Sequence, residues 1–244
     1  MSKTNRRRIV NSSHFLRNAF ILLAASLLSA AIAWADDEAA RFEMWEEPSH
    51  QLVFVEGPAR VLDVRIAPGL TSDFHKHRFA TVYVVIQDAL VANQFWEDEW
   101  SASGPRDYRD TGVTVDNANY VAKPYYHRVR NEDEHTFHVV AVINEREAAG
   151  SVTTAIAEGA IDNSWFREHR AHVAANGMSE TVKFSNDVVV VQPAAGSSYI
   201  LEGGVAHGFK GAPAAFSWHP AGSEFRIANR SENEMEFVLI EVKD

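Results

Sequence analysis

The sequence predicts an all-β protein with two similar halves. Short segments rich in valine, isoleucine and aromatic residues are separated by turns that contain glycine, proline, asparagine or aspartate. A strand, an asparagine, an acidic turn and a second strand follow one another in that order once in each half. This pattern is typical of β-sandwiches and β-barrels, so we expect one such unit in each half.

The expected strands are assigned from their apolar residues. In the first half they cover residues 52–55, 59–66, 81–86, 89–96 and 136–143. In the second half they cover residues 187–192, 225–229 and 235–242. Between the halves, residues 163–175 carry a few apolar side chains in a polar background and are expected to form a helix. We expect a first domain over residues 40–150 and a second domain over residues 151–244.

The first 35 residues have the order of a secretory signal peptide. Five basic residues come before or at the start of an uncharged apolar run at 19–33, and Ala33-Trp34-Ala35 provides a small-x-small cleavage site. That run rises only about 22 Å as a helix, which is less than the roughly 30 Å of a bilayer core. We therefore expect residues 1–35 to be a signal peptide and the protein to be periplasmic or secreted. A retained membrane anchor is the alternative, and the Arg6-Arg7 pair leaves the export route open.

Charge and cysteine content narrow the classes of function. Removing residues 1–35 takes away five basic residues and no acidic one, which changes the net charge from −10 to −15. Such a surface repels nucleic acid and anionic lipid, so we expect no nucleic-acid partner and no stable membrane insertion after signal cleavage. The chain has no cysteine, so any metal ion must be held by histidine, aspartate, glutamate or water.

Three histidines indicate a metal site in the first half. His75 and His77 are two residues apart, so on a strand their side chains point to the same side. The spacing to His127 allows this third histidine to arrive from a neighbouring strand. Three neutral imidazoles would form one face of a divalent metal site and leave its other positions open. Two solvent-facing histidines on an edge strand are the alternative, because His-x-His is common in strands.

These residues resemble the motifs of a known family. Gly69-(x5)-His75-x-His77, followed by a strand, is similar to the first motif of the cupin superfamily. His127-(x3)-Asn131 is similar to the end of the second cupin motif. The resemblance implies a cupin-like, jelly-roll type β-barrel in the first domain.

The second half carries a degenerate copy of the second motif. Pro220-x-Gly222-x2-Phe225-x3-Asn229 matches it except that Phe225 stands at the ligand position. The chain therefore resembles a two-domain cupin, a bicupin, with two β-barrels. We expect Val190 and Gln192 to stand where His75 and His77 lie in the first half, and the second domain to hold no metal ligands.

The first motif also departs from the family pattern. Cupins usually carry a glutamate four or five residues after the second histidine, and here those positions are Thr81 and Val82. A site of three histidines leaves the full charge of the ion uncompensated, which favours anionic, chelating substrates. Fe(II) is the favoured metal, with Mn, Ni or Zn as alternatives.

Several functions remain open for such a site. Three-histidine cupin sites resemble those of diketone-cleaving and thiol dioxygenases, so an exported mononuclear metalloenzyme acting on a small-molecule substrate is expected first. Lyase or isomerase chemistry on the same metal is an alternative. A non-catalytic cupin that binds a small ligand or a metal ion is another, because one fold hosts many functions.

Two nearby residues are candidates to assist catalysis. Tyr83 has the strand parity of the two histidines, and His138 follows the third ligand along the chain. An ordinary structural role is the alternative for both. The aromatic segment at 92–126 is expected to cover the barrel mouth as a lid or to join the two barrels or the subunits of a homodimer.

Overall fold

The computed structural model describes residues 42–101, 109–147, 161–209 and 213–244. Strands account for nearly all of the regular structure in these ranges, with one short helix, α2 (Asn119–Ala122). This confirms the all-β prediction. The expected signal peptide at residues 1–35 lies outside the described residues. Within them, no helix is long and apolar enough to cross a membrane.

The first half forms two antiparallel sheets. The larger sheet has five strands, in the order β1 (His50–Glu56), β2 (Ala59–Ile66), β8 (Phe137–Asn144), β4 (Ala80–Gln87) and β6 (Thr114–Asp116). The smaller sheet has three strands, in the order β3 (His75–His77), β7 (Tyr125–Asn131) and β5 (Val91–Phe95).

The second half also forms two antiparallel sheets, each of four strands. One has the order β14 (Ala215–His219), β11 (Asp187–Gln192), β16 (Met235–Val242) and β9 (Phe166–Val173). The other has the order β10 (Val182–Lys183), β15 (Glu224–Asn229), β12 (Ser198–Glu202) and β13 (Val205–Phe209).

The helix expected at residues 163–175 is wrong, because this segment is the edge strand β9. Every residue of β9 pairs with β16, from Phe166 opposite Val242 to Val173 opposite Met235. The polar residues between these two ends take hydrogen-bond or ion-pair partners; Arg170, for example, bonds Glu236 at 2.6 Å. Pairing with the strongly apolar β16 therefore overrides the weak helical pattern of the segment.

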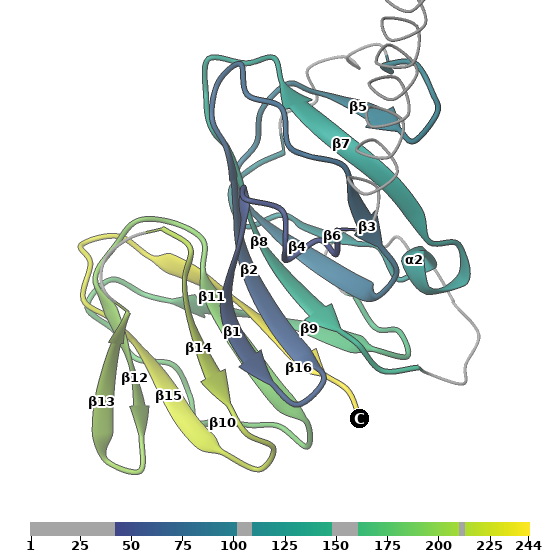
Figure 1. The fold of residues 1–244 in the computed structure, drawn as a ribbon. Coiled ribbons are helices and arrows are strands. Elements are labelled where there is room, and N and C mark those ends of the chain that lie inside the picture. Colours follow the sequence, from purple (N-terminus) through teal and green to yellow (C-terminus); the bar gives the residue numbers. More distant parts are fainter. Residues whose placement is uncertain (1–41, 102–108, 148–160, 210–212) are drawn as a thin grey trace, which may run out of the picture.

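The five-stranded sheet of the first half packs face to face with the β14-β11-β16-β9 sheet of the second half, as Figure 1 shows. Val82 and Val140 of the first half share one buried apolar cluster with Val189 and Ile240 of the second half. The opposite face of the second-half sheet is buried against β12, β13 and β15 in a second cluster, and the opposite face of the first-half sheet carries a third cluster that includes Leu62 and Val139. Since both faces of β4 and β11 are covered, these strands have almost continuous apolar sequences rather than alternating ones.

Matching asparagines end β7 and β15. Asn131 and Asn229 are both fully buried, and each Nδ2 donates to the carbonyl oxygen four residues later, His135 in one half and Asn233 in the other, at 2.7 Å in both. Each Oδ1 accepts a backbone N–H two residues later, at 2.9 and 2.7 Å. In the strands on either side of these turns, a residue of the first half is therefore structurally equivalent to the residue of the second half that lies the same number of sequence positions from its own asparagine.

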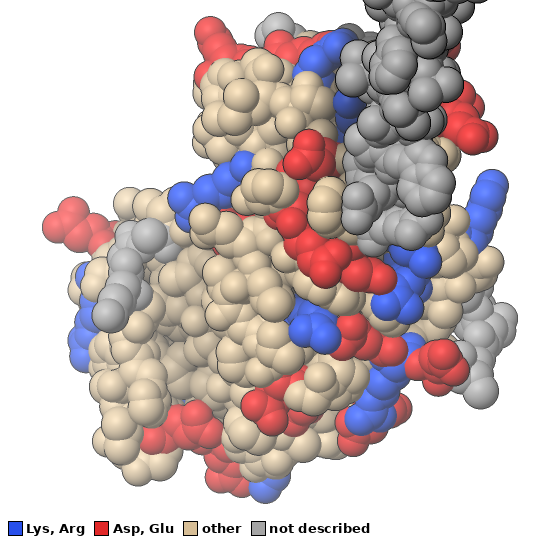
Figure 2. Space-filling view, viewed as in Figure 1, with Lys and Arg blue, Asp and Glu red and all other residues tan. Residues whose placement is uncertain are grey.

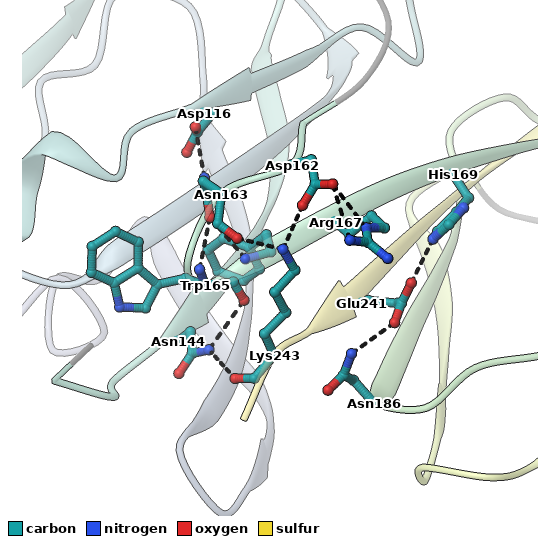
Figure 3. Close-up of polar contacts among 11 residues, drawn as sticks. Asp116, Asn144, Asp162, Asn163, Trp165, Arg167, His169, Asn186, Glu241 and Lys243 are labelled. Atoms are coloured by element: carbon teal, nitrogen blue, oxygen red, sulfur yellow. Dashed lines mark hydrogen bonds and ion pairs between the residues drawn. The ribbon is translucent and has the colours of Figure 1, made fainter. Parts of the chain in front are cut away.

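Polar contacts fix the segment that enters β9 (Figure 3). The Oδ1 of Asn163 accepts the backbone N–H groups of Trp165 and Phe166, and its Nδ2 donates to Asp116 of β6 at 2.8 Å. Asn144 of β8 donates to the carbonyl oxygen of Lys243 at 3.0 Å. These bonds join the first half to the start and the end of the second.

Surface charges of both signs are interspersed on the face shown in Figure 2. Arg60 pairs with Glu145, and Arg78 pairs with Glu43, each at 2.8 Å. Ion pairs at this level of exposure contribute little to stability. The apolar layers between the sheets are thus the main stabilising feature of the fold.

Candidate metal centre

The three predicted ligands meet on the inner face of the smaller first-half sheet. β3 pairs with β7 so that His75 lies directly opposite His127, and His77 points to the same side as His75 because it is two residues further along β3. All three side chains are buried. One nitrogen from each lies within 4.8 Å of the others, which confirms the predicted grouping.

Neighbouring acceptors fix two of the imidazole rings. The Nδ1 of His75 lies 2.8 Å from the carbonyl oxygen of Asp73, and the Nδ1 of His127 lies 3.2 Å from the Oδ1 of Asn93. Because these oxygens only accept, both Nδ1 atoms carry the proton and donate it. The Nε2 atoms of these two rings are then left with free lone pairs that face the site.

The Nε2 atoms form a set that fits a metal ion. The Nε2 of His77 lies 2.9 Å from the Nε2 of His127, and the Nε2 of His75 is buried with no hydrogen-bond partner among the described residues. Two nitrogens bound at right angles to one ion, each about 2.0–2.1 Å from it, would lie roughly 2.9 Å apart. A buried nitrogen without a partner is costly, and a shared cation would satisfy all three.

Burial keeps the three imidazoles neutral. Desolvation, followed by the nearby histidines, holds the pKa values of His75 and His77 well below the usual value. Desolvation and then the charge of His50 lower the pKa of His127 to about 3. A metal ion requires unprotonated imidazole, so the fold provides the ligands in the required form.

A fourth histidine, which the sequence analysis missed, lies in the wall of the site. The ring of His50 is buried 4.5 Å from the ring of His75, and its Nδ1 lies 2.6 Å from the Oε2 of Glu47. Burial alone would raise the pKa of Glu47, but bonds from His50 and from two backbone N–H groups lower it. One of those groups is the N–H of Asp73, so Glu47 also supports the residue that orients His75. The Glu-x-x-His spacing before the first strand is the one sequence signal for this pair.

The histidines open into a cavity of about 510 Å³. Its walls are mostly apolar, and Val64, Val85 and Val139 come from the larger sheet. Its polar lining comprises the four histidines, Tyr83, Asp88, Asn93, Arg109, Asn117, Tyr120 and Tyr125. A pocket of this size and composition suits a small organic molecule.

Tyr83 lies in the site, as its strand parity predicts. Its hydroxyl is 3.2 Å from the Nδ1 of His77. Desolvation raises the pKa of Tyr83 well above the usual value, and it also raises those of Tyr120 and Tyr125, which lie close to it. All three hydroxyls therefore stay protonated, and Tyr120 is hydrogen-bonded to both Tyr83 and Tyr125.

His138 does not face the cavity. Its neighbours Phe137 and Val139 on β8 line the cavity, so the side chain of His138 points to the other side of the sheet. There its Nε2 bonds the Oδ1 of Asp63 at 2.8 Å. The geometry gives no support to the predicted catalytic role and favours the structural alternative.

The aromatic segment at 92–126 divides into two groups. Phe95, Tyr120 and Tyr125 line the cavity, while Trp96 packs on the outer side against Phe74, with ring centroids 4.9 Å apart. The described part of this segment thus supplies the cavity wall. Tyr108 lies outside the described residues.

Among the described residues of the second half, the positions equivalent to the histidines carry apolar side chains. Phe225 lies four residues before its asparagine, as His127 does in the first half. β10 places Val182 opposite Phe225, just as β3 places His75 opposite His127. Neither side chain can bind a metal.

The expected register of the second half is wrong. Val182 and Phe184, rather than Val190 and Gln192, are the equivalents of the two histidines of β3. Val190 and Gln192 lie on β11, which pairs with β16 as β4 pairs with β8. The two-residue strand β10 is too short to be visible as an apolar run.

Comparison with known proteins supports the fold. The sequence matches no protein-family model and no curated protein sequence. The structure is similar to AerE from Microcystis aeruginosa, with a TM-score of 0.59, 11% identity and coverage of 81% of this chain and 94% of that one. It is also similar to salicylate 1,2-dioxygenase from Pseudaminobacter salicylatoxidans (TM-score 0.54, 8% identity, coverage 80% and 77%). A third similar structure is a cupin 2 conserved barrel domain protein from Leptotrichia buccalis, with a TM-score of 0.50, 9% identity and coverage of 80% of this chain and 88% of that one.

These likenesses show that the chain has the cupin fold. The resemblance seen in the motifs around His75, His77 and His127 is therefore confirmed at the level of the fold. At these identities the likeness establishes the fold, and the activity of this chain has to be argued from its site.

The metal-binding prediction is tested by a single ligand substitution. Wild-type protein loaded with Fe(II) and then desalted should retain close to one ion per chain, and His127→Ala should retain less than a tenth of that, because two nitrogens cannot replace three. His135→Ala, at an exposed histidine in the same half, is the matched control and should retain the ion. Elemental analysis gives the ratio, and equal retention by His127→Ala would contradict the assignment.

The buried imidazoles also predict how pH affects the metal-free protein. The unfolded chain binds protons on these histidines below about pH 6.5, and the folded chain does not until far lower pH. The free energy of unfolding should therefore fall as pH falls from about 6.5 towards 3. His127→Gln removes one such group, so the free energy of unfolding of this variant should change less steeply with pH, by up to about 1.4 kcal/mol per pH unit. Urea titrations between pH 5 and 7 measure both slopes, and equal slopes would show that His127 is not held neutral.

Proposed function

We propose that this protein is an exported two-domain cupin enzyme with one metal centre. His75, His77 and His127 hold a mononuclear divalent ion, with Fe(II) favoured, and the cavity beside them takes a small anionic substrate. The observation that carries the proposal is the group of three buried histidines, one nitrogen of each within 4.8 Å of the others, in which the Nε2 of His75 has no hydrogen-bond partner among the described residues. The proposed location rests on residues 1–35, and the N-terminal residue of the mature protein would test it.

The donor set determines the chemistry. Three neutral imidazoles leave the charge of the ion uncompensated, so an enolate, thiolate or phenolate substrate would balance it. A bound Fe(II) ion would supply Lewis acidity and access to reactions with dioxygen. Glu47 is the nearest buried carboxylate that the structure ties to the site, and it acts through His50 rather than on the ion position.

The chain's own residues would bind and orient the substrate. The apolar walls of the cavity exclude water, which strengthens the polar interactions inside it. Tyr83 would donate a hydrogen bond to an anionic oxygen of the substrate, since burial keeps its hydroxyl protonated. Arg109 lies in the cavity lining and would attract a substrate carboxylate.

The salicylate dioxygenase neighbour favours oxygenase chemistry over lyase or isomerase chemistry. One of its structures holds gentisate, with a TM-score of 0.51 and 8% identity to this chain. Gentisate is a small aromatic molecule with oxygen donors and a carboxylate, which suits the size and polarity of this cavity. We propose chelating aromatic hydroxy acids as the first class of substrate, with diketones and thiols after them.

Oxygen consumption tests the proposal. Fe(II)-loaded protein should consume dioxygen in proportion to the substrate lost with at least one member of a panel of aromatic diols, diketones and thiols. Tyr83→Phe should keep its iron but lose about tenfold in kcat/KM, because it lacks one donor to the substrate. His138→Ala should keep both its iron and its activity.

The other outcomes separate the alternatives. No oxygen uptake by iron-loaded protein with any class would contradict the oxygenase proposal. Product formation without oxygen would then indicate a lyase or isomerase. Tight retention of a ligand without any reaction would indicate a binding protein.

A further inference from the structure

A second group of polar side chains lies inside the second half, away from the histidine site. The Oγ of Ser217 is 2.8 Å from the Nε2 of His219, and the Nδ1 of His219 is 3.0 Å from the Oε2 of Glu202. His219 is buried, whereas Ser217 and Glu202 are partly exposed. The three side chains thus form one hydrogen-bonded chain that reaches solvent at both ends.

This chain of residues faces the interior of the second half. Ser217 and His219 lie opposite Val190 and Val188 across the pairing of β14 with β11. Both valines belong to the apolar cluster between the two four-stranded sheets. Directly paired residues share a face, so Ser217 and His219 point into that space.

Glu202 occupies the place of a cavity residue of the first half. In the first half, β5 pairs with β7, the strand that ends at Asn131, and places Phe95 opposite His127. In the second half, β12 pairs with β15, the strand that ends at Asn229, and places Glu202 opposite Phe225. Phe95 lines the metal cavity, so Glu202 stands at the position equivalent to a substrate-facing wall residue.

The same holds for the other two residues of the group. β6 pairs with β4 in the first half as β14 pairs with β11 in the second. When the two halves are aligned on Asn131 and Asn229 and the strand pairings are followed from there, Val115 corresponds to Ser217 and Asn117 corresponds to His219. Val115 and Asn117 line the metal cavity. All three polar residues therefore stand where the first half would contact its substrate.

The group has the order of a nucleophile, a base and an orienting acid. Desolvation lowers the pKa of His219 although Glu202 partly offsets it, so the ring is neutral at pH 7 and able to accept a proton. The carboxylate of Glu202 accepts from Nδ1, which leaves the Nε2 lone pair directed at the hydroxyl of Ser217. Stacking on Phe225, with ring centroids 4.0 Å apart, also holds the ring in place.

We propose that the second domain carries a hydrolytic site in which Ser217 is the nucleophile, His219 the general base and Glu202 the orienting acid. The substrate class is a small ester with an apolar acyl group, because Ser217 lies directly opposite Val190 of the apolar cluster. This activity is independent of the metal centre and goes beyond the function proposed for it.

The reaction balances with water as the only co-reactant. The Oγ of Ser217 attacks the acyl carbon while its proton passes to the Nε2 of His219. The bond between the acyl carbon and the ester oxygen breaks, and the alcohol leaves with that proton. Water then attacks the acyl group on Ser217, gives a proton to His219, and releases the carboxylic acid as Ser217 recovers its proton. Glu202 keeps its hydrogen bond to the Nδ1 of His219 throughout.

Covalent labelling and ester hydrolysis test this proposal on the full chain. A fluorophosphonate should add one phosphonyl group per chain, and peptide mapping should place it on Ser217. Hydrolysis of p-nitrophenyl acetate should fall to the background rate in Ser217→Ala and by about 10- to 100-fold in Glu202→Gln. Ser223→Ala, on the loop that leads into β15, is the matched control and should keep the activity.

Further variants separate this site from the metal centre and from misfolding. His127→Ala should keep the esterase activity, and Ser217→Ala should keep the wild-type metal content and circular dichroism spectrum. Labelling at Ser217 that is lost in His219→Gln would support the proposal. Labelling at another residue, or hydrolysis by Ser217→Ala at the wild-type rate, would overturn it and leave the three residues with a structural role.

Discussion

The antiparallel pairing of β3 with β7 is the constraint on which the metal centre depends. It sets His75 opposite His127 and, through the alternation along a strand, turns His77 to the same side. The carbonyl oxygen of Asp73 and the side-chain oxygen of Asn93 then hold the Nδ1 protons of His75 and His127, which leaves the Nε2 atoms of both rings free to bind an ion. The larger sheet supports this arrangement because it is buried on both faces and cannot shift without exposing an apolar layer.

The sequence was sufficient for the features that depend on local spacing. The all-β class, the three histidines and the repeated asparagine turn follow from alternation and short motifs. Features set by pairing between distant strands were not predictable: β9 lacks a clear alternating pattern, and β10 is too short to detect. His138 follows the third histidine along the chain but lies on the face of β8 away from the cavity, because position along the chain does not determine which face of the next strand a residue occupies. His50 and Glu47 meet the site from a segment that the motifs do not include.

The two halves place different polar side chains at equivalent positions of one fold. In the first, imidazoles and tyrosines surround a cavity. In the second, Phe225 stands at the position of His127, and its ring stacks on His219, which bonds Ser217 and Glu202. Loss of ligands thus does not leave an entirely apolar interior. This agrees with the general rule that function resides in sites placed on a fold rather than in the fold itself.

X-ray absorption spectroscopy of the Fe(II)-loaded protein is the most direct measurement of the central claim. The account predicts a first shell that contains three nitrogens at about 2.0–2.2 Å, with the outer-shell scattering typical of imidazole rings. The remaining first-shell atoms would be light oxygen donors from solvent. A first shell of oxygen alone, or imidazole scattering that corresponds to a single ring, would contradict it.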